Sequence, residues 1–359
     1  MRTHKVRAAV LRDGGGPLKI ETLELEGPLE DEVLVRLSAS GICHTDIGFV
    51  DGGAGEPVVL GHEGAGVVEE AGEKVKGLSP GDHVVLSYLS CGSCGPCKKR
   101  RPFDCERLFE ANFGFSRLDG SNGYWRSDVK GHFFGQSSFA TMCLSTKRNI
   151  VKVEKELPLE LLAALGCGLQ TGAGTVMNIF KIKKGQSLAI FGTGAVGLAA
   201  VMAGRINGAG PIIGVDIVPK RLKLALELGA THVVDSRDED TASRIKAVTG
   251  KGVDFVLDTT GDLEMSRISS EVLNPGGVAA DVTGIASERT LPGGRKAISV
   301  IQGNSVPQSF IPKLIRLYKE GLFPFDRLVK FYDFRDINKA ITASKSGRVI
   351  KPVLKMIGK

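Results

Sequence analysis

Apolar and polar positions follow two different patterns along the 359-residue chain. In the first part, short runs at 33–37, 66–69 and 83–86 have the length and β-branched content of strands. Gly, Pro and Asp turns such as 79–82 separate these runs. Many short strands with frequent turns predict an antiparallel, barrel-like unit.

From about residue 159 the pattern changes to an alternation of strand and helix. The strand-like runs are 187–191, 211–216, 253–258 and 277–282, and the helical stretches are 196–205 and 220–228. This alternation predicts an α/β unit with a parallel, doubly wound sheet. Mixed helix and loop follow, and a final strand-like run covers 350–354.

Composition is that of an ordinary folded protein. At roughly 100–200 residues per domain the length predicts two domains, and 42% hydrophobic with 24% charged residues excludes a disordered chain. No apolar run approaches the roughly 18 residues of a membrane helix, and the first residues lack the apolar core of a secretory signal. We therefore expect a cytoplasmic protein with no membrane partner. The net charge of +7 suits an anionic cofactor as well as nucleic acid.

A glycine-rich turn joins the first strand of the α/β part to its helix. Gly192, Gly194 and Gly197 form G-x-G-x-x-G between an apolar strand and an Ala-rich helix. They permit a tight turn, a close pyrophosphate and close helix packing, respectively. Asp216 ends the next strand, where its carboxylate can accept hydrogen bonds from ribose hydroxyls and would repel a 2′-phosphate. The pattern predicts NAD binding in preference to NADP, the alternative being a βα turn without a ligand.

Four cysteines form the spacing C-x2-C-x2-C-x7-C at positions 91, 94, 97 and 105. Four thiolates this close are typical of a closed, tetrahedral structural zinc site, made here by Cys91, Cys94, Cys97 and Cys105. An iron–sulfur cluster and a nucleic-acid-binding zinc module are the alternatives. The fourth interval differs from the ferredoxin spacing, and no aromatic residues interleave the basic run 98–101. We expect structural zinc and no nucleic-acid partner, with the basic run either solvated or offsetting thiolate charge.

Three other metal-binding side chains, Cys43, His62 and Cys167, each lie beside small residues that would let a metal approach. Two thiolates and one imidazole leave one coordination position open, as in catalytic zinc sites. A lone Cys or His is more often a packed core residue, so the spacing alone leaves that alternative open. Cys143, the seventh cysteine, is expected to be an inert packed thiol.

Taken in order, five motifs resemble those of the zinc-dependent medium-chain alcohol dehydrogenases over essentially the whole chain. They are G-I-C-H-T-D (41–46), G-H-E-G (61–64), the four-cysteine spacing, G-C-G-L-Q-T-G (166–172) and G-T-G-A-V-G (192–197). Residues 44–46 and 86–94 most resemble the aryl-alcohol (benzyl alcohol) dehydrogenases. The resemblance implies a GroES-like catalytic domain at 1–168 and 304–359 and a Rossmann NAD-binding domain at 169–303. It also implies a homodimer or homotetramer.

The resemblance assigns catalytic roles by position. The residues that would hold a catalytic zinc are Cys43, His62 and Cys167. Asp46 would orient His62, and Glu63 could ligate the metal transiently. Thr45 would receive the proton of the substrate. The family's second relay residue is a histidine, and Gly48 stands at its position, so the proton would leave by water or another group.

The resemblance also assigns cofactor contacts besides the glycine turn and Asp216. Thr171 and Val196 would hold the nicotinamide ring, and Lys351 would contact the pyrophosphate. His44 stands where many relatives have arginine against the pyrophosphate. Arg221 would lie either near the adenosine ribose or in solvent. The expected cofactors are therefore NAD and two zinc ions per chain, one catalytic and one structural.

The activity implied is reversible NAD-linked oxidation of a primary aryl alcohol to its aldehyde. Ser87 replaces a bulkier side chain of some relatives, which leaves room for a ring. The Phe-rich segment 109–134 either packs on its own barrel or covers the substrate channel. Alternative substrates are another alcohol, a polyol or hydroxymethyl-glutathione, and the alternative direction is biosynthetic aldehyde reduction. The alternative outside the enzymes is a nucleotide-binding protein with the same fold.

Overall fold

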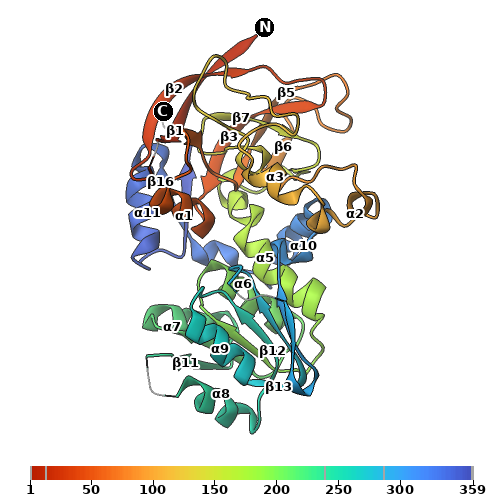
Figure 1. Cartoon of the computed structure of the whole chain (residues 1–359), viewed down its shortest axis with the longest axis vertical. Helices are drawn as coiled ribbons and strands as arrows, with labels where there is room; N and C mark the ends of the chain where they lie inside the picture. The colour runs from red at the N-terminus through yellow and green to blue at the C-terminus, as the bar shows by residue number, and fades with distance from the viewer. Residues whose placement is uncertain (1, 13, 238–239, 286–287, 357–359) are drawn as a thin grey trace. The chain divides into compact units, whose positions relative to one another are not determined.

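The computed structural model describes residues 2–12, 14–237, 240–285 and 288–356 (Figure 1). The chain divides into two compact units. The first holds residues up to 167 together with 306–312 and the segment from 326, and the second holds 168–305 and 313–325. The sequence predicts a first domain of residues 1–168 and 304–359, whereas residues 168, 304–305 and 313–325 group with the second unit. The division falls inside helix α10 (Pro307–Lys319), whose residues 307–312 belong to the first unit and 313–319 to the second.

The first unit is built on β-sheets, as its alternating short apolar runs predict. Its larger sheet has the strand order β16-β17-β3-β5-β6-β8, with β7 also paired to β3. The apolar run 33–37 lies in β3 (Glu32–Gly41), whose residues are almost all buried between neighbouring strands. The other strands are β5 (Gly64–Ala71), β6 (His83–Leu86), β7 (Met142–Thr146), β8 (Ile150–Lys152), β16 (Val329–Asp333) and β17 (Lys351–Lys355).

A smaller sheet of order β2-β1-β4 completes the β structure of this unit. Its strands are β1 (Thr3–Leu11), β2 (Lys19–Glu26) and β4 (Val58–Val59). The helices are α1 (His44–Gly52), α2 (Gly95–Lys98), α3 (Leu108–Phe113), α4 (Leu159–Leu162) and α11 (Ile337–Lys345). One hydrophobic core, with Leu34, Leu86 and Phe139 at its buried centre, joins both sheets.

The second unit is a seven-stranded sheet of order β11-β10-β9-β12-β13-β15-β14. All neighbours are parallel except β14 and β15, which pair antiparallel. The strands are β9 (Leu188–Phe191), β10 (Ile212–Asp216), β11 (His232–Asp235), β12 (Val253–Asp258), β13 (Leu273–Asp281), β14 (Arg289–Leu291) and β15 (Arg295–Ser299). Counted along the chain, the parallel strands have the spatial order of a Rossmann sheet.

Helices connect successive parallel strands of this sheet from β9 to β13. They are α6 (Ala195–Ile206), α7 (Pro219–Leu228), α8 (Thr241–Thr249) and α9 (Leu263–Glu271), and Figure 1 shows α7, α8 and α9 beside the strands. A further helix, α5 (Gly168–Gly174), precedes β9. The strand order reverses between β9 and β12, and ligands of such sheets bind at that point. The glycine turn after β9 lies there. Among the described residues, no helix is long and apolar enough to cross a membrane.

Candidate functional site

Four metal-binding side chains meet in the first unit, although the sequence separates them widely. Cys43, His62, Glu63 and Cys167 each place one ligand atom within 4.8 Å of the others. Cys43 caps the N-terminus of α1, and His62 and Glu63 immediately precede β5. Cys167 follows a 3-10 turn. We call these four residues the Cys43 cluster.

Asp46 fixes the orientation of the His62 imidazole. The Nδ1 atom of His62 lies 3.0 Å from Oδ1 of Asp46, and both side chains are fully buried. The backbone N–H groups of Cys43 and Gly61 also donate to this carboxylate. Burial lowers the pKa of His62, but the charge and hydrogen bond of Asp46, together with those of Cys43, outweigh it and leave this pKa well above its usual value. Nε2 is buried without a hydrogen-bond partner among the described residues, so it is available to a ligand.

The chemistry of the Cys43 cluster suits zinc. Two thiols and one imidazole are the donor set of catalytic zinc sites that keep an open position. The hydrogen bond to Cys167 lowers the pKa of Cys43 well below the usual value of a thiol. A low pKa favours the thiolate, which is the form that binds metal.

Glu63 forms a buried ion pair with Lys351. Nζ of Lys351 lies 2.6 Å from Oε1 and 2.5 Å from Oε2 of Glu63, and it donates at 3.3 Å to the carbonyl of Ile42. Burial raises the pKa of Glu63 to about 6, although the ammonium opposes this shift. The lysine that the resemblance assigns to the cofactor pyrophosphate is thus 2% exposed and already paired with a carboxylate. Its pyrophosphate contact stays a prediction.

The predicted relay residues lie on the first turns of α1. Thr45 is half-buried, with Oγ1 4.0 Å from Sγ of Cys43. His44 and Gly48 are exposed on the same helix. Ser87 is fully buried, and its hydroxyl donates to the carbonyl of Gly166 at 2.8 Å. This hydrogen bond fixes the small side chain of Ser87 next to Gly166, the residue that precedes Cys167 in the sequence.

The structure brings together the four cysteines of the second predicted zinc site, Cys91, Cys94, Cys97 and Cys105. The Sγ atoms of Cys91 and Cys97 are 4.0 Å apart, and those of Cys94 and Cys105 are 3.9 Å apart. A tetrahedral ion about 2.3 Å from each sulfur needs sulfur–sulfur distances of about 3.8 Å. The cluster therefore has the size of a zinc site, and the basic run 98–101 beside it is exposed.

Aromatic side chains that the sequence analysis did not assign to the site surround His62. The ring of Phe134 stacks on the imidazole with centroids 4.3 Å apart, and the ring of Phe133 meets it edge-on at 5.4 Å. The side chain of Gln136 donates to the carbonyl of His62 at 3.0 Å. The Phe-rich composition of 109–134 was the available signal, but it does not reveal which rings touch the histidine.

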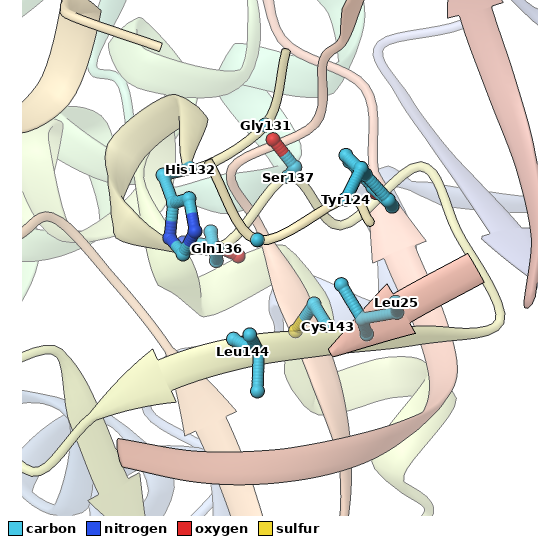
Figure 2. A pocket seen from close by; sticks show the side chains of 9 residues that line it. Leu25, Tyr124, Gly131, His132, Gln136, Ser137, Cys143 and Leu144 are labelled. Atoms are coloured by element: carbon cyan, nitrogen blue, oxygen red, sulfur yellow. The ribbon is translucent and has the colours of Figure 1, made fainter. Parts of the chain in front are cut away.

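Gln136 also lines a small pocket with His132, Tyr124 and Cys143 (Figure 2). Burial lowers the pKa of His132 to about 3 and raises that of Cys143 to about 12. The thiol of Cys143 is 1% exposed. Both side chains are therefore held in their neutral forms.

The glycine turn of the second unit has the geometry of a phosphate-binding turn. Gly192 has φ of 85°, a conformation that glycine adopts readily. A Cβ on Gly197 would lie 1.9 Å from the carbonyl oxygen of Gly192, so only glycine permits this helix packing. A Cβ on Gly194 would meet nothing within 4 Å, so space remains above the N-terminus of α6. That terminus presents free N–H groups and positive potential.

Asp216 lies beside this turn, at the end of β10. Its Oδ2 accepts hydrogen bonds from the N–H of Thr193 at 2.7 Å and from the hydroxyl of Thr193 at 2.9 Å. Its Oδ1 accepts from the N–H of Val218. Arg221 is 4.0 Å from the same carboxylate. The sequence did not reveal these bonds, which hold the acid in place.

The predicted nicotinamide contacts lie on two helices that touch closely. A Cβ on Gly172 of α5 would lie 1.9 Å from the carbonyl oxygen of Val196 in α6. Thr171, the residue before Gly172, is 8% exposed. Because the two backbones approach this closely, Thr171 and Val196 lie near each other in the second unit.

Comparison with known proteins gives the family. Residues 29–155 match the alcohol dehydrogenase GroES-like domain family, and 195–318 match the zinc-binding dehydrogenase family. The chain is 44% identical to a geraniol dehydrogenase from Castellaniella defragrans, over 97% of both chains. A benzyl alcohol dehydrogenase structure from Acinetobacter calcoaceticus is 42% identical with TM-score 0.94, covering 99% of this chain and 100% of that one. An alcohol dehydrogenase zinc-binding domain protein from Burkholderia ambifaria is 46% identical with TM-score 0.95, at the same coverage. The chain belongs to the zinc-dependent medium-chain alcohol dehydrogenase family.

Proposed function

We propose that this alcohol dehydrogenase couples oxidation of a primary aryl alcohol to reduction of NAD, with zinc held by Cys43, His62 and Cys167. The observation that carries the proposal is the group formed by one half-buried thiol, one buried thiol and the imidazole Nε2 atom, which has no hydrogen-bond partner among the described residues. Zinc bound there would supply Lewis acidity toward the oxygen of the alcohol. The second zinc would be held by Cys91, Cys94, Cys97 and Cys105.

The protein's own residues orient the site and move the proton. Asp46 accepts the hydrogen bond of Nδ1 of His62, which leaves Nε2 as the donor atom for a metal. The hydroxyl of Thr45 accepts the proton that the alcohol loses. Gly48 lies three residues later, on the same face of α1, and is exposed. Because Gly48 has no side chain to continue a relay, the proton passes from Thr45 to water.

The choice of NAD over NADP rests on Asp216. Its carboxylate is 7% exposed and is held by Thr193 and Val218 at the edge of the glycine turn. Oδ2 already accepts two hydrogen bonds from Thr193, whereas Oδ1 accepts one from Val218 and keeps a lone pair for a ribose hydroxyl. A 2′-phosphate at the same place would bring two negative charges together. Arg221, 4.0 Å from this carboxylate, is a cation that could reduce this repulsion.

An aromatic substrate is supported by the rings around His62 and by the relatives. Phe49, Phe113, Phe133 and Phe134 form a connected set of ring contacts that includes the imidazole. One similar protein is a benzyl alcohol dehydrogenase, and another is a geraniol dehydrogenase. The latter favours a second candidate substrate, a branched allylic alcohol of the geraniol type.

Initial rates with benzyl alcohol, geraniol, ethanol and sorbitol, each with NAD and with NADP, test the proposal. We expect the highest kcat/KM with benzyl alcohol and NAD, and about two zinc ions per chain. Cys43→Ser should abolish turnover while NAD binding is retained. Turnover that survives in Cys43→Ser would contradict the site. A preference for ethanol would contradict the substrate class, and a preference for NADP would contradict the role of Asp216.

A further inference from the structure

The loop of residues 132–137 contacts His62 through three of its side chains. Phe134 stacks on the imidazole with an interplanar angle of 22°, and Phe133 meets it at 88°. The side chain of Gln136 donates to the carbonyls of His62 and Ser87 at 3.0 Å each and accepts from the N–H of Gly64 at 3.0 Å. The loop therefore holds both the ring and the backbone of the histidine. We call residues 132–137 the His62 collar.

The backbone of the collar is strained. His132, Phe134 and Ser137 have φ of 61°, 52° and 52°, in the left-handed region that non-glycine residues seldom adopt. Such conformations persist only when surrounding contacts hold them, and they concentrate at functional sites. Here the side chain of Asn149 donates to the carbonyls of Phe134 and Gly135 at 3.3 Å and 3.0 Å.

Ordinary core packing does not require this conformation. Phe134 is 6% exposed, and phenylalanine can be buried equally well from extended backbone, which carries no such strain. Its left-handed conformation has a specific result, because it aims the ring at the face of the imidazole. The centroid distance of 4.3 Å is at the short end of stacked aromatic pairs.

The hydrogen bond to Asp46 is a single restraint on the plane of the His62 ring. Rotation about the Cβ–Cγ bond would tilt the ring and lengthen the bond at Nδ1. Rotation would move Nε2 away from Cys43 and Cys167. The flat face of Phe134 and the edge of Phe133 oppose that rotation.

We propose that Phe134 is a positioning residue that fixes the plane of His62 and so preorganises the Cys43 cluster for its metal. This role rests on the zinc site of the proposed function and adds a residue that does not itself bind zinc. It predicts weaker metal binding when the ring is removed, even if Cys43, His62 and Cys167 are all unchanged.

Phe134→Leu tests the role, because leucine keeps apolar bulk but has no ring face. The matched control is Phe109→Leu. Phe109 belongs to the same chain of rings, since it stacks on Phe113 at 5.0 Å and Phe113 contacts Phe134 at 5.1 Å. It is 78% exposed and has no ring contact with His62 in the described chain. Two readouts apply: zinc transfer to a chromogenic chelator, and the visible spectrum of the Co²⁺-substituted protein. Cys43→Ser identifies which zinc belongs to the Cys43 cluster.

We expect zinc affinity at the Cys43 cluster to fall about two- to tenfold in Phe134→Leu, the range of one aromatic contact. The Co²⁺ bands should shift in Phe134→Leu, and neither readout should change in Phe109→Leu. Unchanged affinity and spectrum in Phe134→Leu would overturn the inference and leave the proposed function intact. If Cys43→Ser loses no zinc, the cluster is not a zinc site, and both fall. Should Phe134→Leu not fold, Phe134→Met tests the same contact.

Discussion

Replacing Lys351 with methionine tests the electrostatics beside the Cys43 cluster. Methionine keeps most of the apolar stem and removes the ammonium, which holds both oxygens of Glu63 at 2.6 Å and 2.5 Å. The carboxylate is fully buried, so water cannot replace the lost partner. Glu63 must then either keep a buried charge that has lost its ammonium or bind a proton.

The cost of each route can be compared. An unpaired buried charge costs about 3–5 kcal/mol of the free energy of unfolding. Protonation costs about 1.36 kcal/mol for each pH unit above the unfolded pKa of about 4.5, or roughly 5 kcal/mol at pH 8 and roughly 1.5 kcal/mol at pH 5.5. Without Lys351 the folded pKa of Glu63 rises further above the unfolded value. The destabilisation of Lys351→Met therefore grows as pH rises, from about 1.5 kcal/mol at pH 5.5 to about 3–5 kcal/mol at pH 8.

Urea unfolding followed by the fluorescence of Trp125 measures this effect. Trp125 is the single tryptophan of the chain and lies in the first unit, so its signal reports the unit that contains the ion pair. Lys152→Met is the matched control, because Lys152 is half-exposed and its Nζ lies 2.8 Å from Oδ2 of Asp82. Such pairs contribute under about 1 kcal/mol. Changing Glu63 to methionine as well should recover most of the loss. A loss that is equal at both pH values would refute the reasoning.

Three further predictions concern other parts of the chain. Cys94→Ser should remove about one zinc ion per chain and lower the unfolding midpoint of Trp125 fluorescence; normal zinc content would contradict the four-cysteine site. Because burial lowers the pKa of His132 to about 3, its contribution to stability is complete above pH 6.5 and is lost as pH falls toward 3. Between pH 6.5 and pH 4 this contribution to the free energy of unfolding should fall by about 3 kcal/mol. His132→Asn should lack this part of the pH dependence, as urea unfolding at several pH values would show. Gly172→Ala should lower the free energy of unfolding by about 1–3 kcal/mol through overpacking against Val196. It should also weaken NAD binding, as measured by calorimetry; unchanged affinity would show that this contact does not shape the cofactor site.

Much of the fold could be predicted from the sequence because the relevant signals are local. The apolar runs at 187–191 and 253–258 are the buried central strands β9 and β12, and the glycine turn follows β9 as its spacing indicates. Likewise, Cys91 and Cys94 belong to one short segment, so that their proximity follows from spacing. The roles of these residues in binding NAD and zinc stay predictions.

The ion-pair partner of Glu63 and the aromatic rings beside His62 could not be predicted, because these contacts depend on tertiary structure. Lys351 is 288 positions from Glu63, and no periodicity relates β17 to the start of β5. The left-handed backbone of Phe134 has no sequence signal either, since phenylalanine is among the residues least expected there. Both residues contact members of the Cys43 cluster.

The strain in residues 132–137 has a consequence for engineering this enzyme. Glycine substitutions at left-handed positions are a standard way to stabilise a protein, because they remove the steric cost of the Cβ. At Phe134 the same change would also delete the ring that faces the imidazole of His62. A screen that selects only for heat resistance could therefore enrich variants here that survive higher temperatures yet hold their metal poorly, and it should be paired with selection for turnover.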